Sequence, residues 1–262
     1  MRDDGITYIG TISFGKDSVT MMDLLLKNNY PVDYIVFTDT MLEFPMMYEY
    51  KAKVTKYFKE RYNKEVITTK PKTSFEDWCF GVMESGELKG YTRGIPMVWS
   101  EPCYWRRESK VKPQEELFKD IGKHKIYIGF TLDESNRVML DDKFEYPLIN
   151  TFKMTERDCQ EYLINQEMQN PLYNYFTRTG CSVCPAQSDK AWFQVWKNFS
   201  DTWEYMKDVE NRLSKIEKVK NATWFSGFRS CEDMEKKFIK AEKQGSLFDF
   251  SDEPLKDCFC KI

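Results

Sequence analysis

The chain has 262 residues, of which 41% are hydrophobic and 31% are charged, and its formal net charge is −3. This composition is sufficient for a folded core, which excludes an intrinsically disordered chain, and the slightly acidic balance excludes nucleic-acid binding through overall positive charge. No segment approaches the roughly 18 consecutive apolar residues that cross a bilayer, and Arg2-Asp3-Asp4 leads directly into an apolar run, so we expect a cytoplasmic protein with no membrane partner.

The first half of the chain alternates strand and helix patterns. Four apolar or β-branched runs predict strands at residues 6–12, 34–37, 66–68 and 126–130. Helical patterns separate the first three of these runs, at residues 17–29 and 45–62. This alternation predicts an α/β fold with a parallel sheet covered on both faces, in which ligands bind at the carboxyl ends of the strands.

The second half is predicted to be mainly helical. Residues 79–113 first interrupt the alternation with glycines and prolines, and they predict a long loop rich in basic and aromatic side chains. Helical patterns then occupy residues 155–168, 188–218 and 230–243. We therefore expect an α/β domain at residues 1–150, a helical region with a Cys-x-x-Cys loop at residues 151–245 and a tail at residues 246–262.

The most informative segment is the hexapeptide Ser-Phe-Gly-Lys-Asp-Ser that begins at Ser13, between the first predicted strand and the first predicted helix. The N-terminus of a helix has unpaired N–H groups and partial positive charge, which attract anions. Gly15 lets the backbone approach a phosphate, Lys16 adds a positive charge, and Ser18 adds a hydroxyl donor, as Ser13 does. Asp17 beside phosphates requires a cation such as Mg²⁺ between them. The segment predicts a nucleotide phosphate site; an ordinary helix N-terminus is the alternative.

Polar segments follow two further predicted strands. Thr38 and Asp39 follow the second strand, and the segment from Asp133 to Arg137 follows the fourth. Because the ends of parallel strands share one edge, we expect these residues to border the same site as the hexapeptide. Helix capping is the alternative role of Asp39 and Asp133.

The basic loop and the cysteines supply the remaining candidates. Arg106, Arg107 and Lys110 are candidates for contacts with the phosphates of the nucleotide or with a nucleic-acid backbone. His124 is the single histidine beside eight cysteines, which excludes multi-histidine metal sites. In a reducing compartment we expect these cysteines to be thiols or metal ligands rather than disulfides.

Cys181 and Cys184 have the spacing of a metal chelate or a redox dithiol. We expect Cys103 as the third metal ligand and Cys159 as the fourth, with Cys231 as the alternative fourth ligand. A site made of cysteines alone suits an iron–sulfur cluster or zinc. The alternative is that these cysteines are buried small side chains, and the roles of the pair near the C-terminus, Cys258 and Cys260, stay open.

Several segments together resemble one superfamily. The hexapeptide resembles the S-G-G-K-D-S signature of PP-loop ATP pyrophosphatases (adenine nucleotide alpha-hydrolases), with Phe14 in place of the first glycine. Three segments are similar to motifs of the phosphoadenosine phosphosulfate (PAPS) reductases, at residues 37–45, 103–113 and 129–137. Gly180-Cys181-Ser182-Val183-Cys184-Pro185 is similar to an element of the branch that contains the DNA phosphorothioation protein DndC and phage-encoded relatives.

The resemblance, which covers residues 5–200, implies a parallel-sheet PP-loop domain that binds ATP, or PAPS or APS, and in the DndC-like branch a [4Fe–4S] cluster. It implies that Lys16, Asp17 and Arg137 serve catalysis. It also implies nucleotide and Mg²⁺ contacts from Ser13, Gly15, Lys16, Asp17, Ser18, Phe37, Thr38, Asp39, Gly129 and Arg137.

Three functions are compatible with these residues. The first is an enzyme that activates a substrate by adenylation for sulfur transfer, with a sulfur donor such as a cysteine desulfurase as partner. The second is a PAPS or APS reductase whose attacking thiol is Cys258 or Cys260, although the E-C-G-x-H segment of such reductases is absent. The third is a nucleic-acid-binding accessory protein of a DNA-modification or phage system.

Overall fold

A computed structural model describes residues 5–244, and the tail with Cys258 and Cys260 lies outside the described residues. The chain forms two compact units, which are considered one at a time. Of the described residues, the first unit comprises residues 5–71 and Ser109–Thr179, and the second comprises Lys72–Glu108 and residues 180–244. This division differs from the boundaries expected from the sequence, because residues 72–108 belong with the C-terminal helices and the helix that follows Thr155 belongs to the first unit.

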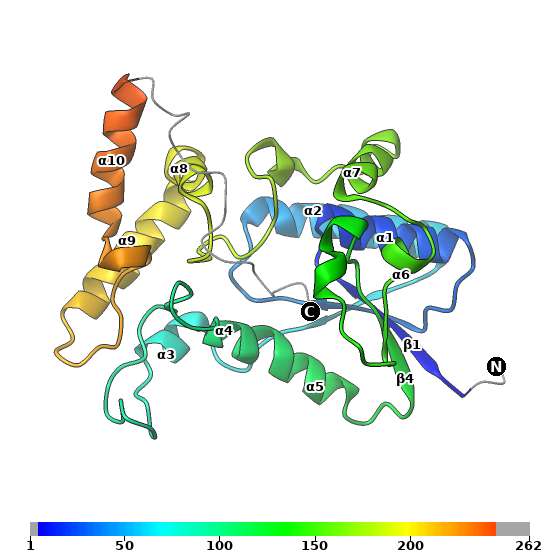
Figure 1. The fold of residues 1–262 in the computed structure, drawn as a ribbon, viewed down its shortest axis with the longest axis horizontal. Helices are drawn as coiled ribbons and strands as arrows, with labels where there is room; N and C mark the ends of the chain where they lie inside the picture. Colours follow the sequence, from blue (N-terminus) through cyan, green and yellow to red (C-terminus); the bar gives the residue numbers. More distant parts are fainter. Residues whose placement is uncertain (1–4, 245–262) are drawn as a thin grey trace. The chain divides into compact units, whose positions relative to one another are not determined.

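The first unit is built on a five-stranded parallel sheet, as the strand and helix alternation predicts (Figure 1). The strand order is β3-β2-β1-β4-β5. The strands are β1 (Thr7–Ile12), β2 (Tyr34–Thr38), β3 (Val66–Thr69), β4 (His124–Tyr127) and β5 (Phe144–Glu145). In the register of the sheet, Ile9 of β1 lies opposite Tyr34 on one side and Ile126 on the other. The strand order changes direction between β1 and β4, which places the loops after these two strands at the switch point where such sheets bind ligands.

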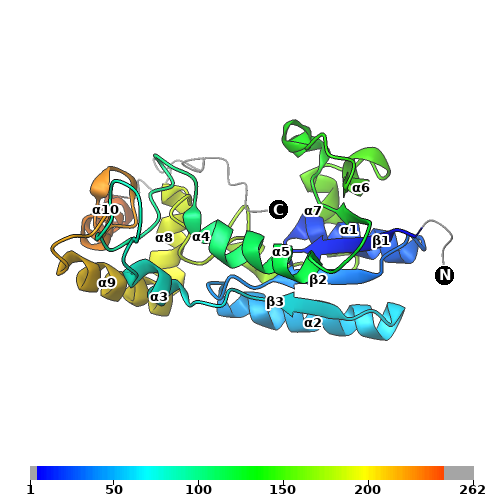
Figure 2. The same ribbon diagram turned by 90° about the horizontal axis from the view of Figure 1, so that it is seen from below.

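Helices cover the two faces of this sheet. The connections α1 (Lys16–Lys27) and α2 (Pro45–Tyr62) advance in one direction along the sheet, whereas α5 (Lys112–Phe118) returns in the other. Right-handed crossovers therefore place α1 and α2 on one face and α5 on the opposite face, and Figure 2, viewed from below, has α5 in front of the strands. The unit also contains α6 (Pro147–Asn150), α7 (Glu156–Asn165) and the 3₁₀ segments η2 (Leu132–Arg137) and η3 (Pro171–Asn174).

The core of the first unit lies between the sheet and its helices. Ile9, Val36, Ile126 and Phe130 belong to one buried apolar cluster on the sheet. Helix α1 is buried along almost its whole length, including its N-terminal residues. The start of α1, which is part of the predicted phosphate loop, therefore lies in the packed interior of the first unit.

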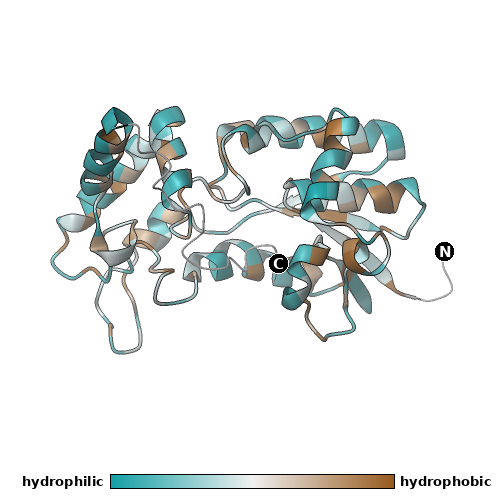
Figure 3. Cartoon of the chain, turned by 45° about the horizontal axis from the view of Figure 1, so that its top comes forward, coloured by the Kyte–Doolittle hydropathy of each residue, from teal (hydrophilic) through white to brown (hydrophobic). Residues whose placement is uncertain are grey.

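The second unit is helical and has an aromatic core. It contains α3 (Phe75–Phe80), α4 (Tyr104–Arg106), α8 (Asp189–Asn198), α9 (Ser200–Ser214), the 3₁₀ turn η4 (Ser226–Phe228) and α10 (Cys231–Gln244). Phe75 stacks on Trp224 with ring centroids 5.8 Å apart and meets Trp105 edge-on at 5.4 Å. The helices carry bands of hydrophilic and hydrophobic residues, as amphipathic helices around such a core require (Figure 3). No helix within residues 5–244 has both the length and the apolar character that crossing a bilayer requires.

The structure corrects two predicted elements. Residues 79–113 are not a loop throughout, because α4 leads through the π-helical turn η1 (Arg107–Val111) directly into α5. Pro113 stands in the first turn of α5, where a missing backbone N–H is tolerated. The single helix predicted at residues 188–218 is broken at Phe199, whose non-helical backbone (φ −132°, ψ 62°) separates α8 from α9.

Candidate functional site

The loop after β1 is braced by its own serines. The hydroxyl of Ser18 donates to the carbonyl of Gly15 at 3.0 Å and accepts from the backbone N–H of Ser13 at 3.1 Å. The two serine hydroxyls lie 3.1 Å apart. Gly15 is the residue directly before α1, and no side chain caps the helix from that position. The loop therefore presents backbone N–H groups at the start of a buried helix, the geometry that favours anions.

The loop after β4 comes into direct contact with the start of α1. A Cβ atom at Gly129 would lie 3.0 Å from the Cα and 3.1 Å from the backbone nitrogen of Ser18. Only a glycine permits this approach without displacement of the backbone. The predicted nucleotide residue Gly129 thus fits loop-to-helix packing at the switch point of the sheet.

Lys16 is buried and has oxygen partners from elsewhere in the first unit. Its ammonium nitrogen lies 2.6 Å from Oε2 of Glu156, and its side chain is 7% exposed. Its backbone N–H donates to the hydroxyl of Tyr173 at 2.9 Å, and its ammonium lies 5.1 Å from the centre of the Tyr173 ring. Burial opposes the charge of Lys16, but Tyr173, Asp17 and Glu156 outweigh burial and raise the pKa of its ammonium.

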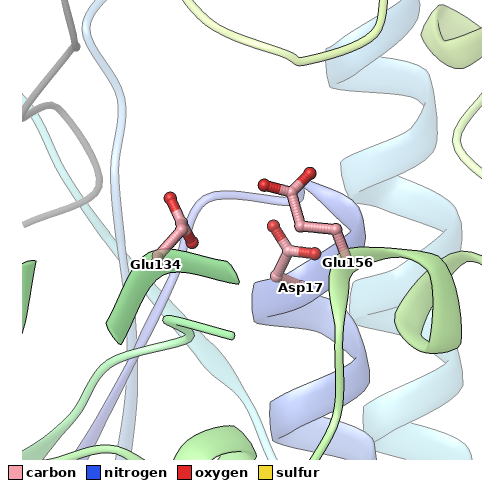
Figure 4. Close-up of side chains that lie close together, drawn as sticks. All are labelled: Asp17, Glu134 and Glu156. Carbon is pink, nitrogen blue, oxygen red and sulfur yellow. The ribbon is translucent and has the colours of Figure 1, made fainter. Parts of the chain in front are cut away.

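Three carboxylates gather beside this loop (Figure 4). Asp17 comes from the start of α1, Glu156 from the start of α7 and Glu134 from η2, and their ligand oxygens all lie within 4.8 Å of one another. Arg137 Nη1 lies 2.5 Å from Oε1 of Glu134, and the guanidinium lies 4.7 Å from the ring centre of Phe130. Carboxylate oxygens are the ligands that Mg²⁺ prefers, so the donor set fits the divalent cation expected beside Asp17.

The end of β2 forms a second polar region of the first unit. Thr38 is buried, and its hydroxyl accepts from the amide of Gln114 at 3.0 Å. Asp39 accepts from the backbone N–H of Met41 at 2.8 Å and from the hydroxyl of Tyr48 at 2.9 Å. Asp39 therefore braces its own loop and does not cap α2, which begins at Pro45 after Phe44.

The side chain of Phe37 is buried against Phe14 of the loop after β1. It meets Phe14 edge-on with ring centroids 5.0 Å apart, and the ammonium of Lys51 lies 4.7 Å from its ring centre. Burial lowers the pKa of Lys51, and the nearby carboxylate of Asp39 opposes this shift. Lys51 adds a cation to this region that the sequence patterns do not single out.

The remaining predicted residues lie in different places. Asp133 caps α7, because its Oδ2 accepts from the backbone N–H of Glu156 at 2.7 Å. Lys110 belongs to the first unit, whereas Arg106 and Arg107 belong to the second. Burial raises the pKa of Glu43, and the positive charge of Lys110 opposes this rise.

The cysteines divide between the units. Cys159 is fully buried on α7, and its carbonyl accepts from the hydroxyl of Thr20 at 3.2 Å in the first unit. Cys103, Cys181 and Cys184 belong to the second unit and are half-buried. In the part of the chain that the structure describes, the set of three or more ligand atoms within 4.8 Å of one another consists of carboxylates, not of thiols. The cysteine metal site stays a prediction from the sequence.

Sequence reasoning missed several residues that contact the loop. Glu134 stands inside the segment at residues 129–137, but Glu156 and Tyr173 carry no motif of their own. Asn170 is fully buried, and its amide donates to the carbonyl of Phe14 at 3.0 Å. The only local signal for Glu156 is its place after the helix-starting Thr155, and the contacts of Tyr173 and Asn170 leave no signal in the sequence.

A comparison with protein-family models supports the PAPS reductase part of the resemblance, whereas the DndC-like and phage-encoded branch stays a prediction. The sequence matches the family model of the phosphoadenosine phosphosulfate reductase domain over residues 7–187. Among curated proteins, none matches the sequence significantly. Among solved structures, a phosphoadenylyl-sulfate (PAPS) reductase from Candida auris, in complex with phosphate, is similar with 19% sequence identity and a TM-score of 0.48. That similarity covers 67% of this chain and 81% of the Candida auris chain.

Proposed function

This chain belongs to the phosphoadenosine phosphosulfate reductase domain family, and from that premise we propose that it is an enzyme that binds ATP, or a related adenine nucleotide, at the loop of residues 13–18. The observation that carries the proposal is the buried, charged Lys16 at the start of α1, beside Gly15 and the brace made by Ser18. A positive charge, backbone N–H groups and a close-approach glycine are the groups that recognise a polyphosphate.

The reaction that we propose is adenylation of a substrate for sulfur transfer. A substrate oxygen forms a bond to the α-phosphorus while the bond to the β-phosphate oxygen breaks, and the electron pair leaves with pyrophosphate. Lys16 and Arg137 would compensate the negative charge that builds up on the phosphates. Asp17, Glu134 and Glu156 would hold the divalent cation, which supplies further charge compensation when it is bound. Phe37 and Thr38 would contact the adenine through main-chain groups.

The test is nucleotide binding by protein that is purified without oxygen. Wild-type protein should bind ATP in calorimetry, and Lys16→Ala should weaken binding roughly ten- to hundredfold, because a charged hydrogen bond contributes about 1.5–3 kcal/mol. Lys27→Ala, at the exposed end of the same helix, is the matched control. Equal ATP affinity of the Lys16→Ala variant and the wild type would refute the proposal, as would the absence of any binding.

We also propose that Cys181 and Cys184 bind an iron–sulfur cluster or zinc. Cys181 and Cys184 belong to one tight turn, in which the N–H of Cys184 donates to the carbonyl of Cys181 at 3.1 Å and the amide of Gln187 donates to the same carbonyl at 3.3 Å. Such a turn suits two adjacent ligands of an iron–sulfur cluster or of zinc. Iron, sulfide and zinc analysis of Cys181→Ser and Cys184→Ser should show loss of the metal, with Cys79→Ser as the control.

A sulfonucleotide reductase is the second candidate, because the family is named for that activity. Its attacking thiol would be Cys258 or Cys260, which lie outside the described residues. Truncation after Pro254 separates the two functions: loss of sulfite release from PAPS or APS supports the reductase, and unchanged nucleotide chemistry supports adenylation. A sulfur donor and a nucleic-acid acceptor stay predictions. Pull-down from a lysate would test the sulfur donor. The salt dependence of DNA binding, compared between the wild type and the variants Arg106→Ala and Arg107→Ala, would test the nucleic-acid acceptor.

A further inference from the structure

The groups that would bind phosphate already have partners within the first unit. The backbone N–H of Lys16 donates to the hydroxyl of Tyr173, and the ammonium of Lys16 is paired with Glu156. Both partners are oxygen acceptors. They therefore satisfy the backbone donor and the cation of the loop in the way that phosphate oxygens would.

The segment that carries Tyr173 lies directly against the loop. A Cβ atom at Gly15 would lie 3.1 Å from the hydroxyl oxygen of Thr179 and 3.4 Å from that of Tyr173. Tyr173 also forms a hydrogen bond with Thr179, so two hydroxyls meet in front of Gly15. Asn170, at the start of the same segment, holds the carbonyl of Phe14. The bare face of Gly15, which a nucleotide needs for close approach, is thus covered by the chain itself.

We propose that Tyr173 and Glu156 are internal substitutes for the phosphates of the nucleotide, and that nucleotide binding displaces both from Lys16. The inference rests on the proposed function, because it assigns the occupant of the same loop. A buried N–H and a buried ammonium are costly to leave unpaired, so the nucleotide-free protein needs acceptors there. A polyphosphate offers several acceptors at once, whereas a single inorganic phosphate offers fewer contacts against the same cost of displacement. Tyr173 therefore contributes to selection of the nucleotide over inorganic phosphate.

Tyr173→Phe tests the displacement, because it removes the hydroxyl and keeps the ring against Lys16. In the nucleotide-free protein the N–H of Lys16 loses its acceptor, whereas in the complex a phosphate oxygen replaces it. ATP affinity in calorimetry should therefore rise about three- to tenfold, the equivalent of one hydrogen bond. The conservative change Tyr175→Phe, in the same segment, should leave ATP affinity unchanged. Glu156→Gln should likewise raise the affinity for ATP in the absence of divalent cations.

The stability of the variant supplies the second readout. Without nucleotide, Tyr173→Phe should melt at a lower temperature than the wild type, and saturating ATP should remove this difference, because the hydroxyl no longer pairs with Lys16 in the complex. Unchanged or weaker ATP affinity of the folded variant would overturn the inference, as would a melting difference that persists at saturation. If the wild type, Tyr173→Phe and Glu156→Gln all fail to bind ATP, the proposed function itself is refuted.

Discussion

Phe14 combines a left-handed backbone conformation with a fully buried side chain. Its backbone φ is 58°, in the left-handed region that costs a non-glycine residue about 1–2 kcal/mol, and its side chain is fully buried. The ring packs edge-on against Phe37. Burial of a phenylalanine contributes about 1.5–3 kcal/mol, which offsets the backbone strain. A side chain therefore takes the place where the related signature has glycine, without blocking the loop.

Phe14→Gly should destabilise the protein, although it relieves the strained backbone. Loss of a buried phenylalanine costs about 3–5 kcal/mol and relief of the strain returns about 1–2 kcal/mol, so we expect a net loss of about 2 kcal/mol in urea unfolding. Asn29→Gly is the control, because Asn29 also has a positive φ of 57° but is exposed. A Phe14→Gly variant as stable as the wild type would show that the ring contributes nothing to the core.

At the scale of elements, a helix with clear signals at both ends could be predicted and an irregular helical path could not. The helix predicted at residues 45–62 matches α2, Pro45–Tyr62, because proline begins it and Asn63 ends it in a left-handed conformation. The helical path through α4, η1 and α5 was hidden by Pro102 and Pro113, which read as loop residues. A π-helical turn before Pro113 has no signature in sequence periodicity.

The site was predictable only where its residues are neighbours in the sequence. Ser13, Gly15 and Lys16 belong to one turn, so a motif reveals them. Glu156 stands 140 residues from its partner Lys16, and Tyr173 stands 157 residues away. Only the packing of α7 and η3 brings these residues to α1, and helix patterns specify neither the neighbour nor the register of such packing.

The contact between the loop after β4 and the start of α1 depends on the absence of a side chain at Gly129. Gly129→Ala would place a methyl group 3.0 Å from the Cα of Ser18, and backbone atoms on both sides must then move. We expect a loss of about 1–3 kcal/mol in urea unfolding and roughly tenfold weaker ATP binding, because the start of α1 shifts. Gly122→Ala is the control, since nothing lies within 4 Å of its Cβ position. Unaltered ATP affinity would show that the two loops do not depend on each other.

At the scale of the whole molecule, the two units have separate cores and separate candidate chemistry. The first unit has the sheet, the loop of residues 13–18 and the carboxylates, and the second has the aromatic core and the turn with Cys181 and Cys184. The chain passes between the units after Pro71, Glu108 and Thr179, so neither unit is a continuous segment. We nevertheless expect each unit to unfold locally as a cooperative group of its own, because its core contacts lie within that unit.

Hydrogen exchange with and without ATP and Mg²⁺ tests this division. Binding to the first unit alone should slow exchange at residues 13–20, 131–137 and 156–160, because ligand binding stabilises the segments that contact it, and leave α8, α9 and α10 unchanged. Slower exchange at Arg106 and Arg107 would show that the nucleotide also affects the second unit. The Lys16→Ala variant, which should lose the effect in every segment, separates specific binding from a general effect of ATP. Protection of α8–α10 equal to that of α1 would contradict a site confined to the first unit.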